Sequence, residues 1–318
     1  MIKSNSHKAG RHFLQVPGPT NIPDRVLQAM AFPAMDHRGP DFQNLSFNVL
    51  KKIKLIFKSE DPVVIFPSAG TGAMEASLAN TLSEGDKILM FETGHFATEW
   101  CQAARRYRLD VDFIPGDWRT GADPKIVEKK LSEDKNHKIK AVLVTHNETS
   151  TGIKSQVEEV RKAIDSTNHP ALFMVDTISS LGSYNYDHQK WKVDVTVGGS
   201  QKGLMCPPGL SFNAISPKAL EAYKKSKITK SYFDWGQMLD NNKNGFYPYT
   251  PAVNLLYALN EAVDMLLEEG LENVFKRHKR HADATRIAVE AWGLEILARN
   301  PIERSDSITA IMVPDGHD

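Results

Sequence analysis

The chain has 318 residues, of which 41% are hydrophobic and 25% charged, and its 39 Lys and Arg residues balance its 39 Asp and Glu residues. This composition is typical of a globular protein long enough to form a large domain and a smaller one. A neutral balance lacks the basic surface that nucleic acid or anionic lipid requires, so we expect neither as a partner.

The sequence gives no sign of membrane insertion or export. No apolar run approaches the roughly 18 to 20 residues that span a bilayer, and residues 1–13 lack the apolar stretch of a signal peptide. The two cysteines, Cys101 and Cys206, lie far apart without a Cys-x-x-Cys spacing, which argues against a disulfide framework or a zinc site. We therefore expect a cytoplasmic protein without a membrane partner.

From residue 63 onward, short β-branched runs alternate with segments of helical period. The predicted strands are 63–66, 87–91, 111–114, 141–145, 172–175, 193–197 and 210–215. Between them, Asp123-Pro124 is typical of a helix start, and Val157, Val160 and Ile164 recur at helical spacing. This alternation predicts an α/β fold with a mainly parallel central sheet flanked by helices.

After Pro251 the pattern changes to two long helical stretches, predicted over 254–269 and 271–292, and then to strand-like segments at 294–298 and 308–313. We interpret residues 1–255 as a large domain and residues 256–318 as the start of a smaller α+β domain. The last residue, Asp318, is a typical helix N-cap with no helix after it. We therefore expect the small domain to be incomplete.

Four predicted strands end in residues that can bind or react with a ligand, and ligands bind beyond the carboxyl ends of the strands in an open α/β sheet. Strand 63–66 is followed by a turn of small residues, 67–76, that opens a helix. Free N–H groups at such a helix start can hold a phosphate, although a tight turn would need the same glycines. Strand 141–145 is followed by the polar run 146–152, which offers hydroxyl groups or forms an ordinary Ser/Thr turn.

The other two strand ends carry a carboxylate and a lysine. Asp176 follows strand 172–175, where a buried charge needs a cationic partner, unless the residue only caps the next segment. Lys202 follows strand 193–197, and a desolvated lysine forms Schiff bases with carbonyl compounds, whereas most lysines are solvated surface charges. Taken together, a phosphate seat, a carboxylate and a Schiff-base lysine are the three anchors of pyridoxal phosphate.

Segments spread over nearly the whole chain match a known family. They include Asp36-His37-Arg38-Gly39-Pro40, Glu92-Thr93-Gly94-His95-Phe96 and Gly199-Ser200-Gln201-Lys202-Gly203, together with 17–23, 68–76, 145–152, 175–176 and 248–251. In these segments the chain resembles the class V branch of fold-type I pyridoxal-phosphate aminotransferases, and most closely the bacterial serine–glyoxylate and alanine–glyoxylate enzymes. The resemblance implies the fold-type I architecture, with a large cofactor-binding domain and a smaller C-terminal domain.

The resemblance also implies roles for individual residues. Lys202 would form the Schiff base and Asp176 would contact the pyridine nitrogen, which makes these two the catalytic residues. The phosphate would be held by residues at a helix start and by the neighbour of the lysine, namely Ala69, Gly70, Thr71 and Gln201. Thr149 would contact the 3′-oxygen of the cofactor.

Three further residues follow from the resemblance. Phe96 would stack on the cofactor ring, unless it is an ordinary core phenylalanine. Tyr247 and Thr250 match residues that reach the phosphate of the neighbouring subunit, which implies a homodimer with shared active sites; local aromatic packing is the alternative for Tyr247. No metal site is expected, because His146 lacks Asp, Glu or His partners at metal-binding spacing.

The implied activity is transamination between an amino acid, serine in preference to alanine, and glyoxylate, giving hydroxypyruvate and glycine. Two alternatives stay open. The first is another class V enzyme, such as an aspartate aminotransferase or a desulfurase, although Phe96 and the scarcity of cysteines argue against a desulfurase. The second is a catalytically impaired fragment or a binding protein, because the arginine that grips the substrate carboxylate in the family, within an Arg-Ile-Gly stretch, is not found before Asp318.

Overall fold

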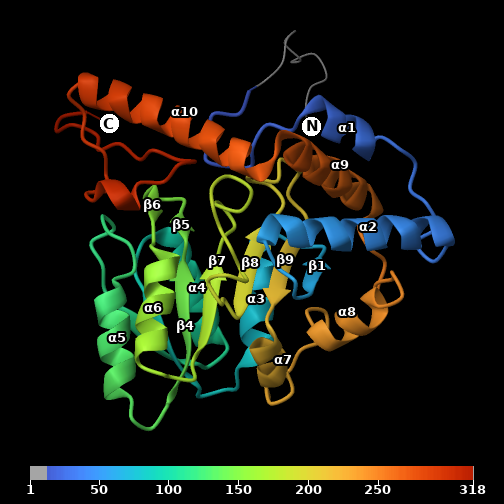
Figure 1. Cartoon of the computed structure of the whole chain (residues 1–318), viewed down its shortest axis with the longest axis horizontal. Coiled ribbons are helices and arrows are strands. Elements are labelled where there is room, and N and C mark those ends of the chain that lie inside the picture. The colour runs from blue at the N-terminus through green and yellow to red at the C-terminus, as the bar shows by residue number, and fades with distance from the viewer. Residues whose placement is uncertain (1–12, 318) are drawn as a thin grey trace.

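The computed structural model describes residues 13–317, in which a seven-stranded sheet with strand order β1-β9-β8-β7-β4-β2-β3 forms the centre of the molecule (Figure 1). The strands of this sheet are β1 (Val63–Phe66), β2 (Lys87–Phe91), β3 (Asp110–Ile114), β4 (Ile139–Thr145), β7 (Leu172–Asp176), β8 (Val195–Gly199) and β9 (Ser211–Ile215). Strands β3, β2, β4, β7 and β8 run parallel, whereas β9 is antiparallel to both β8 and β1. The predicted mainly parallel α/β sheet is confirmed.

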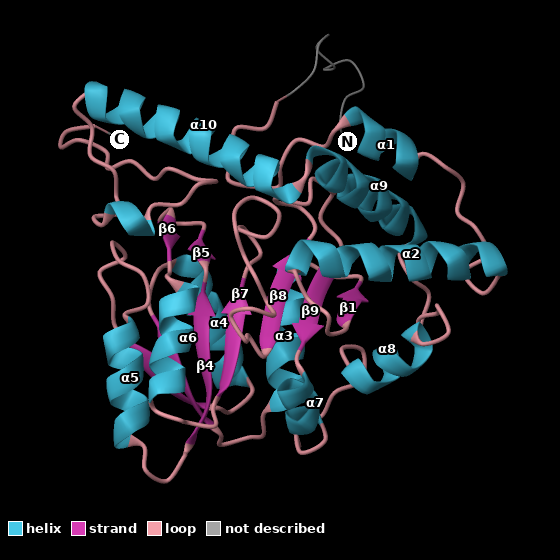
Figure 2. Cartoon of the chain, in the orientation of Figure 1, coloured by secondary structure: helices cyan, strands magenta, loops and turns pink. Residues whose placement is uncertain are grey.

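Helices lie around the strands and bury them (Figure 2). They are α1 (Asp24–Met30), α2 (Pro40–Phe57), α3 (Gly70–Thr81), α4 (His95–Arg106), α5 (Pro124–Glu133), α6 (Val157–Ser166), α7 (Pro217–Tyr223), α8 (Trp235–Asn242), α9 (Val253–Glu269) and α10 (Leu271–Ala291). Asp123 accepts a hydrogen bond from the Lys125 N–H and thereby caps α5, as its sequence predicts. Within residues 13–317, no helix is long and apolar enough to cross a membrane.

Several strand boundaries differ from their predictions: β3 begins one residue earlier than predicted, β4 begins two residues earlier, and β7 ends one residue later. Strand β8 begins at Val195 and ends at Gly199, two residues later at each end than predicted, and β9 begins at Ser211 rather than residue 210. Glycines weaken strand propensity, which is why the local pattern stops early. In the structure, Gly198 and Gly199 pair with Phe212 and Ser211 of β9, so the register with a neighbouring strand extends β8.

The C-terminal part combines two confirmed helices with a correction. Helices α9 and α10 match their predictions closely, and α9 packs against α1 and α2, which precede the sheet. The predicted strands 294–298 and 308–313 do not form. A single antiparallel bridge between Ile296 and Ile311 replaces them, because a two-stranded ribbon without further strands is only marginally stable. The division of the chain at residue 255 stays a prediction, and Asp318 lies outside the described residues.

Helix α10 lies beyond the carboxyl ends of β7 and β8 (Figure 1). The short ribbon of β5 (Asn147–Glu148) and β6 (Ile153–Lys154) stands at the same side, next to the 3-10 helix η2 (Pro301–Glu303). The chain after α10 therefore packs close to the strand ends on which ligand-binding residues were predicted.

Candidate active site

A cavity of about 240 Å³ opens beyond the carboxyl ends of β1, β7 and β8. It is lined by most of the residues that the sequence predicts for the site: Ala69, Gly70, Thr71, Phe96, Thr149, Asp176, Gln201 and Lys202. Segments between residues 69 and 202 reach it because parallel strands deliver their ends to one edge of the sheet. The structure therefore brings the predicted anchors together in one pocket.

The start of α3 forms one wall of this pocket. Ala69 is the N-cap of α3 in an extended conformation, and no side chain of residues 13–317 caps this helix. A Cβ on Gly70 would overlap the side chain of Ile178, which would then have to move, so glycine lets the helix start lie against the loop after β7. The open N–H groups and the positive end of the helix dipole make this wall suitable for an anion such as phosphate.

Asp176 is the last residue of β7 and is 3% exposed. Its register partners are Thr145 on β4 and Val197 on β8, so it occupies the middle of the sheet edge. One carboxylate oxygen, Oδ1, accepts a hydrogen bond from the Ile178 N–H at 2.8 Å, which is the capping contact considered as an alternative. Burial raises the pKa of Asp176 to about 7, and the nearby Glu148 carboxylate adds to the rise. A cationic group in the pocket would stabilise the charged form.

Lys202 lies in the loop between β8 and β9, beneath the segment 17–20. Its Nζ donates a hydrogen bond to the Pro17 carbonyl at 3.1 Å, and a Cβ on Gly18 would overlap the lysine side chain. Thr20 fastens this segment, because its N–H donates to the Gln201 carbonyl at 3.0 Å and its hydroxyl to the Lys202 carbonyl at 3.2 Å. Burial lowers the pKa of Lys202, against the opposing effect of Asp176, and so favours the neutral, nucleophilic amine.

Ser179 belongs to the pocket although the sequence analysis did not single it out. Its hydroxyl donates to the Asn147 carbonyl at 2.9 Å and accepts hydrogen bonds from the Asn147 amide at 2.9 Å and from the Thr149 hydroxyl at 2.8 Å. These contacts join the loop after β7 to the polar run after β4. Its position three residues after Asp176, within the polar run 177–180, was the available signal.

Glu148 is a second residue that the sequence analysis did not identify, and it is fully buried. Its carboxylate accepts hydrogen bonds from the Ala97 N–H at 3.0 Å, the Phe96 N–H at 3.3 Å and the Ser150 hydroxyl at 2.7 Å. It thereby caps the N-terminus of α4 and fixes the backbone of Phe96. Phe96 itself is 37% exposed and lines the pocket, so it is not an ordinary core side chain.

Tyr247 and Thr250 lie away from the pocket of their own chain. Tyr247 is buried and packs edge-to-face against Phe42 with ring centroids 6.0 Å apart, as its alternative interpretation predicts. Thr250 is exposed. Their contact with a neighbouring subunit stays a prediction.

His146 is a buried packing residue. Its Nδ1 lies 3.0 Å from the Ser180 hydroxyl, and burial lowers its pKa to about 3. No group of metal-ligating side chains occurs in residues 13–317.

A second hollow of about 250 Å³ lies on another side of Lys202. It is lined by the loop after β7, by α10 and by the chain that follows α10, including Ser179, Ser183, Arg277, His278, Ser307 and Ile308. Lys202 and Ser179 line both hollows, so they separate the predicted cofactor pocket from the space next to the C-terminal part.

The sheet, the helix start at Gly70, the buried Asp176 and Lys202 define a fold-type I transferase of the pyridoxal-phosphate class. Residues 12–318 match the model of the family described as Aminotransferase class-V, and the chain belongs to this family. It is 47% identical to the serine–glyoxylate aminotransferase of Methylorubrum extorquens, over 98% of this chain and 79% of that protein. It is 45% identical to the L-aspartate–glyoxylate aminotransferase of Paracoccus denitrificans, over 95% of this chain and 77% of that protein.

A solved structure shows the same similarity in three dimensions. The crystal structure of an alanine–glyoxylate aminotransferase from Nostoc sp. superposes with a TM-score of 0.90 and 30% identity, over 98% of this chain and 82% of that one. The predicted class V aminotransferase fold and enzyme class are confirmed.

Proposed function

We propose that this chain binds pyridoxal phosphate and transfers the amino group of serine to glyoxylate, giving hydroxypyruvate and glycine. The observation that carries the proposal is the meeting of Lys202, Asp176 and the start of α3 in one cavity. No other pocket described above combines an amine, a carboxylate and an uncapped helix start.

The residues present fit pyridoxal phosphate. The open N–H groups at Gly70 and Thr71 can donate hydrogen bonds to the phosphate, and the Gln201 side chain lines the same cavity. Asp176 would hold the pyridine nitrogen, and Lys202 the aldehyde carbon. When bound, the cofactor supplies an aldehyde that condenses with amines and a protonated ring that accepts electrons.

Each catalytic side chain then has a defined task. The Asp176 carboxylate favours the protonated ring nitrogen, whose positive charge would in turn lower the raised pKa of Asp176. Lys202 is the amine in the pocket whose lowered pKa suits it to take up and return the proton of the substrate's α-carbon. Phe96 would cover one side of the ring, and Thr149 would contact the 3′-oxygen.

The names of the relatives support glyoxylate more strongly than they support serine. Serine, aspartate and alanine each appear as the donor in one of the three similar proteins, whereas glyoxylate appears in all three. Serine is proposed because the 47% identical relative is named for it. Alanine remains the second donor of the proposal, and aspartate the competing one.

An absorbance and activity assay tests the proposal. The purified chain is mixed with pyridoxal phosphate, its visible spectrum is recorded, and glycine is measured after serine, alanine or aspartate is added with glyoxylate. We expect a shifted cofactor band that is lost in Lys202→Ala and kept in Lys225→Ala. A band unchanged by Lys202→Ala would refute the site assignment. A normal band without glycine from any donor would favour the alternative of a binding protein or impaired fragment.

The proposal includes a homodimer with shared sites, to which Tyr247 and Thr250 contribute across the subunit interface. Thr250 is exposed, so Thr250→Asp should fold and repel a partner-bound phosphate. Mixing inactive Lys202→Ala with inactive Thr250→Asp restores one intact site in each mixed dimer, so about a quarter of wild-type activity should return. Mixtures that stay inactive after confirmed subunit exchange would refute shared sites.

A further inference from the structure

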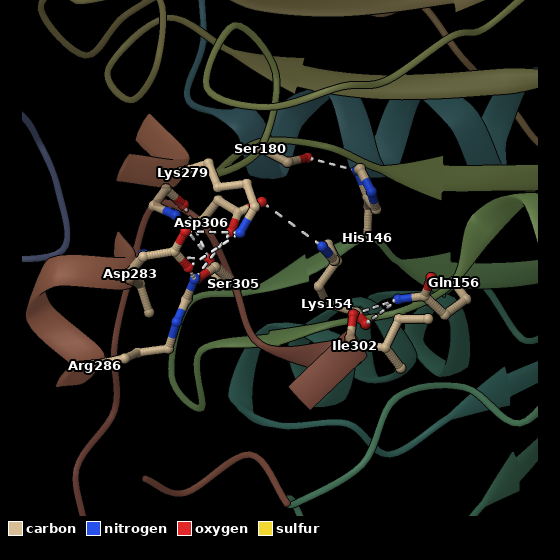
Figure 3. A network of polar contacts seen from close by, with 12 residues as sticks. His146, Lys154, Gln156, Ser180, Lys279, Asp283, Arg286, Ile302, Ser305 and Asp306 are labelled. Atoms are coloured by element: carbon tan, nitrogen blue, oxygen red, sulfur yellow. Dashed lines mark hydrogen bonds and ion pairs between the residues drawn. The ribbon is translucent and has the colours of Figure 1, made fainter. Parts of the chain in front are cut away.

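A charge network centred on the buried Arg286 joins α10 to the segment that follows it (Figure 3). Arg286 on α10 is almost fully buried and donates to the Ser305 carbonyl at 2.7 Å, to Asp283 at 2.5 Å and to Asp306 at 3.4 Å. Buried charges of this kind need such partners, because removing them from water is costly. The guanidinium therefore fixes the position of the chain at Ser305 and Asp306.

Ser305, whose carbonyl binds Arg286, also forms a turn with the residues that follow it. It is fully buried, its N–H donates to the Gly152 carbonyl at 3.0 Å, and its hydroxyl accepts hydrogen bonds from the N–H groups of Ser307 at 3.1 Å and Ile308 at 3.2 Å. The backbone of Ser307 is thus set by Arg286 through one intermediate residue.

Ser307 carries the connection to the cofactor pocket. Its hydroxyl donates to the Ser179 carbonyl at 3.2 Å, and Ser179 is the residue whose hydroxyl accepts the hydrogen bond of Thr149. Ser179 lines both the cofactor pocket and the hollow beside α10. Two hydrogen bonds, both made by Ser179, therefore connect Ser307, which lies outside the predicted cofactor pocket, to Thr149, which lines it.

A second route leads to the same wall. Asp306 lies 3.7 Å from the Lys154 ammonium on β6, and Figure 3 shows Lys154 pointing from the ribbon toward this carboxylate. Lys154 pairs in register with Asn147 on β5, and Asn147 exchanges hydrogen bonds with Ser179. The two routes from Arg286 thus meet at Ser179.

We propose that Arg286 is a positioning residue that acts through Ser305 and Ser307 to hold Ser179, and with it the Thr149 hydroxyl, in the geometry that the cofactor requires. The inference rests on the proposed function for the identity of the cofactor. It assigns Arg286 no contact with the reacting atoms. It predicts that damage to the network weakens cofactor binding through Thr149 rather than by general unfolding.

The first test measures the dissociation constant of pyridoxal phosphate for the full chain by absorbance titration. Ser307→Ala should raise it about fivefold, which corresponds to the loss of one hydrogen bond, and Ser307→Thr, which keeps the hydroxyl, should restore it. In a Thr149→Val background the same Ser307→Ala change should have less than about a twofold effect, because residues that act through one another are not additive. Additive effects, or no effect of Ser307→Ala, would overturn the proposal.

The second test uses Arg286→Met, with Arg161→Met as its matched control. Both arginine side chains are 11% exposed and pair with an aspartate, but Arg161 lies on α6 and contacts Asp165 and the Phe173 ring rather than the Ser305 turn. In Arg286→Met, Asp306 keeps Lys154 and Asp283 keeps Lys279, so neither carboxylate is left alone. We expect a fivefold or greater rise in the dissociation constant for Arg286→Met and none for Arg161→Met, and equal rises would overturn the inference.

Hydrogen exchange separates this inference from the proposed function, because it needs no cofactor. In the cofactor-free chain, Arg286→Met should speed amide exchange in peptides covering 147–151 and 177–181 by about tenfold, while Arg161→Met leaves these peptides unchanged. Unchanged exchange in Arg286→Met would overturn the inference even if the wild-type chain transfers amino groups. Faster exchange in a chain that transfers none would refute the proposed function and support the positioning role.

Discussion

Two buried charged side chains, Arg286 and Asp176, lie in opposite surroundings. The Arg286 guanidinium is enclosed by Asp283, Asp306 and the Ser305 carbonyl, so its charge is matched on several sides. The Asp176 carboxylate accepts one backbone hydrogen bond, and burial raises its pKa to about 7. The paired charge of Arg286 connects two structural elements, whereas the carboxylate of Asp176, which is unpaired within residues 13–317, can bind a cationic group of a ligand.

The largest expected effect is on the rate of amino transfer when the Asp176 carboxylate is replaced by a neutral amide. In Asp176→Asn, amino transfer should fall by at least about 1,000-fold, because a neutral amide does not favour the protonated ring that accepts electrons. The amide oxygen can still accept the Ile178 N–H, so the loop should keep its shape. Glycine formation from serine and glyoxylate measures the loss, and a fall of less than tenfold would contradict the role of Asp176.

The same variant should be more stable than the wild type without cofactor. The unfolded carboxyl has a pKa near 3.8 and the folded one near 7, so the folded state holds the extra proton and stability falls as pH rises between these values. At pH 8, Asp176→Asn should therefore gain up to about 4 kcal/mol in free energy of unfolding. Urea unfolding should show this gain at pH 8 and lose it at pH 4; an equal gain at both values would contradict the assignment.

Removing the paired charge of Arg286 should destabilise the protein, in contrast to Asp176→Asn. Arg286→Ala should lower the free energy of unfolding by about 3 kcal/mol, because the Ser305 carbonyl loses its partner and the arginine stem leaves a cavity. Arg25→Ala removes contacts to Glu261 and Glu268 on an arginine that is 50% exposed, so its effect on the free energy of unfolding should be much smaller. Urea unfolding of both variants makes the comparison, and similar losses would contradict it.

Two buried histidines extend the comparison to acid conditions. Burial lowers the pKa of His146 to about 3 and that of His188 to about 4, from 6.5 in the unfolded chain. The unfolded state therefore takes up protons first, and stability falls as pH drops below 6.5 toward these values. At pH 5, each histidine should cost about 2 kcal/mol.

The His188 contribution can be isolated by replacement. His188 Nδ1 lies 2.7 Å from the Thr196 hydroxyl, a contact that a glutamine side chain can imitate. His188→Gln should therefore flatten the decline of stability between pH 7 and pH 5 relative to the wild type. Urea unfolding at three pH values measures the slopes, and parallel curves would show that His188 does not titrate as expected.

The smallest expected effect concerns the exposed aromatic side chain at the pocket. Phe96→Leu keeps the apolar contact but removes the stacking surface, which is worth roughly 0.5–1.5 kcal/mol. The dissociation constant of pyridoxal phosphate should therefore rise by about two- to tenfold. Glu99→Leu, at an exposed position of the same helix, serves as the control and should leave the constant unchanged; an unchanged constant in Phe96→Leu would exclude stacking.

The parts of the molecule that sequence predicted well are those encoded locally. The strands carry continuous apolar runs, and Asp176 and Lys202 follow such runs directly, so topology alone places them at one edge. The sequence did not predict Glu148, Ser179 or Arg286, because their roles depend on contacts with distant segments. Glu148 contacts the start of α4, and Ser179 contacts Ser307. Helices α1 and α2 were not predicted, and the two C-terminal strands were predicted wrongly, because their local apolar runs find only one bridging pair.

The reversed direction of β9 has a consequence for how the lysine loop folds. Because β9 returns antiparallel beside β8, Lys202 lies in a hairpin, closed by Ser200, whose N–H donates to the Leu210 carbonyl and whose hydroxyl donates to the Pro207 carbonyl. Closing so short a loop costs little chain entropy. Asp176, by contrast, ends β7, whose parallel neighbours β4 and β8 are joined to it by longer crossover connections. The hairpin that carries Lys202 can therefore form from nearly adjacent residues before the sheet edge that holds Asp176 is complete, whereas its contact with Pro17 must wait for the distant N-terminal segment.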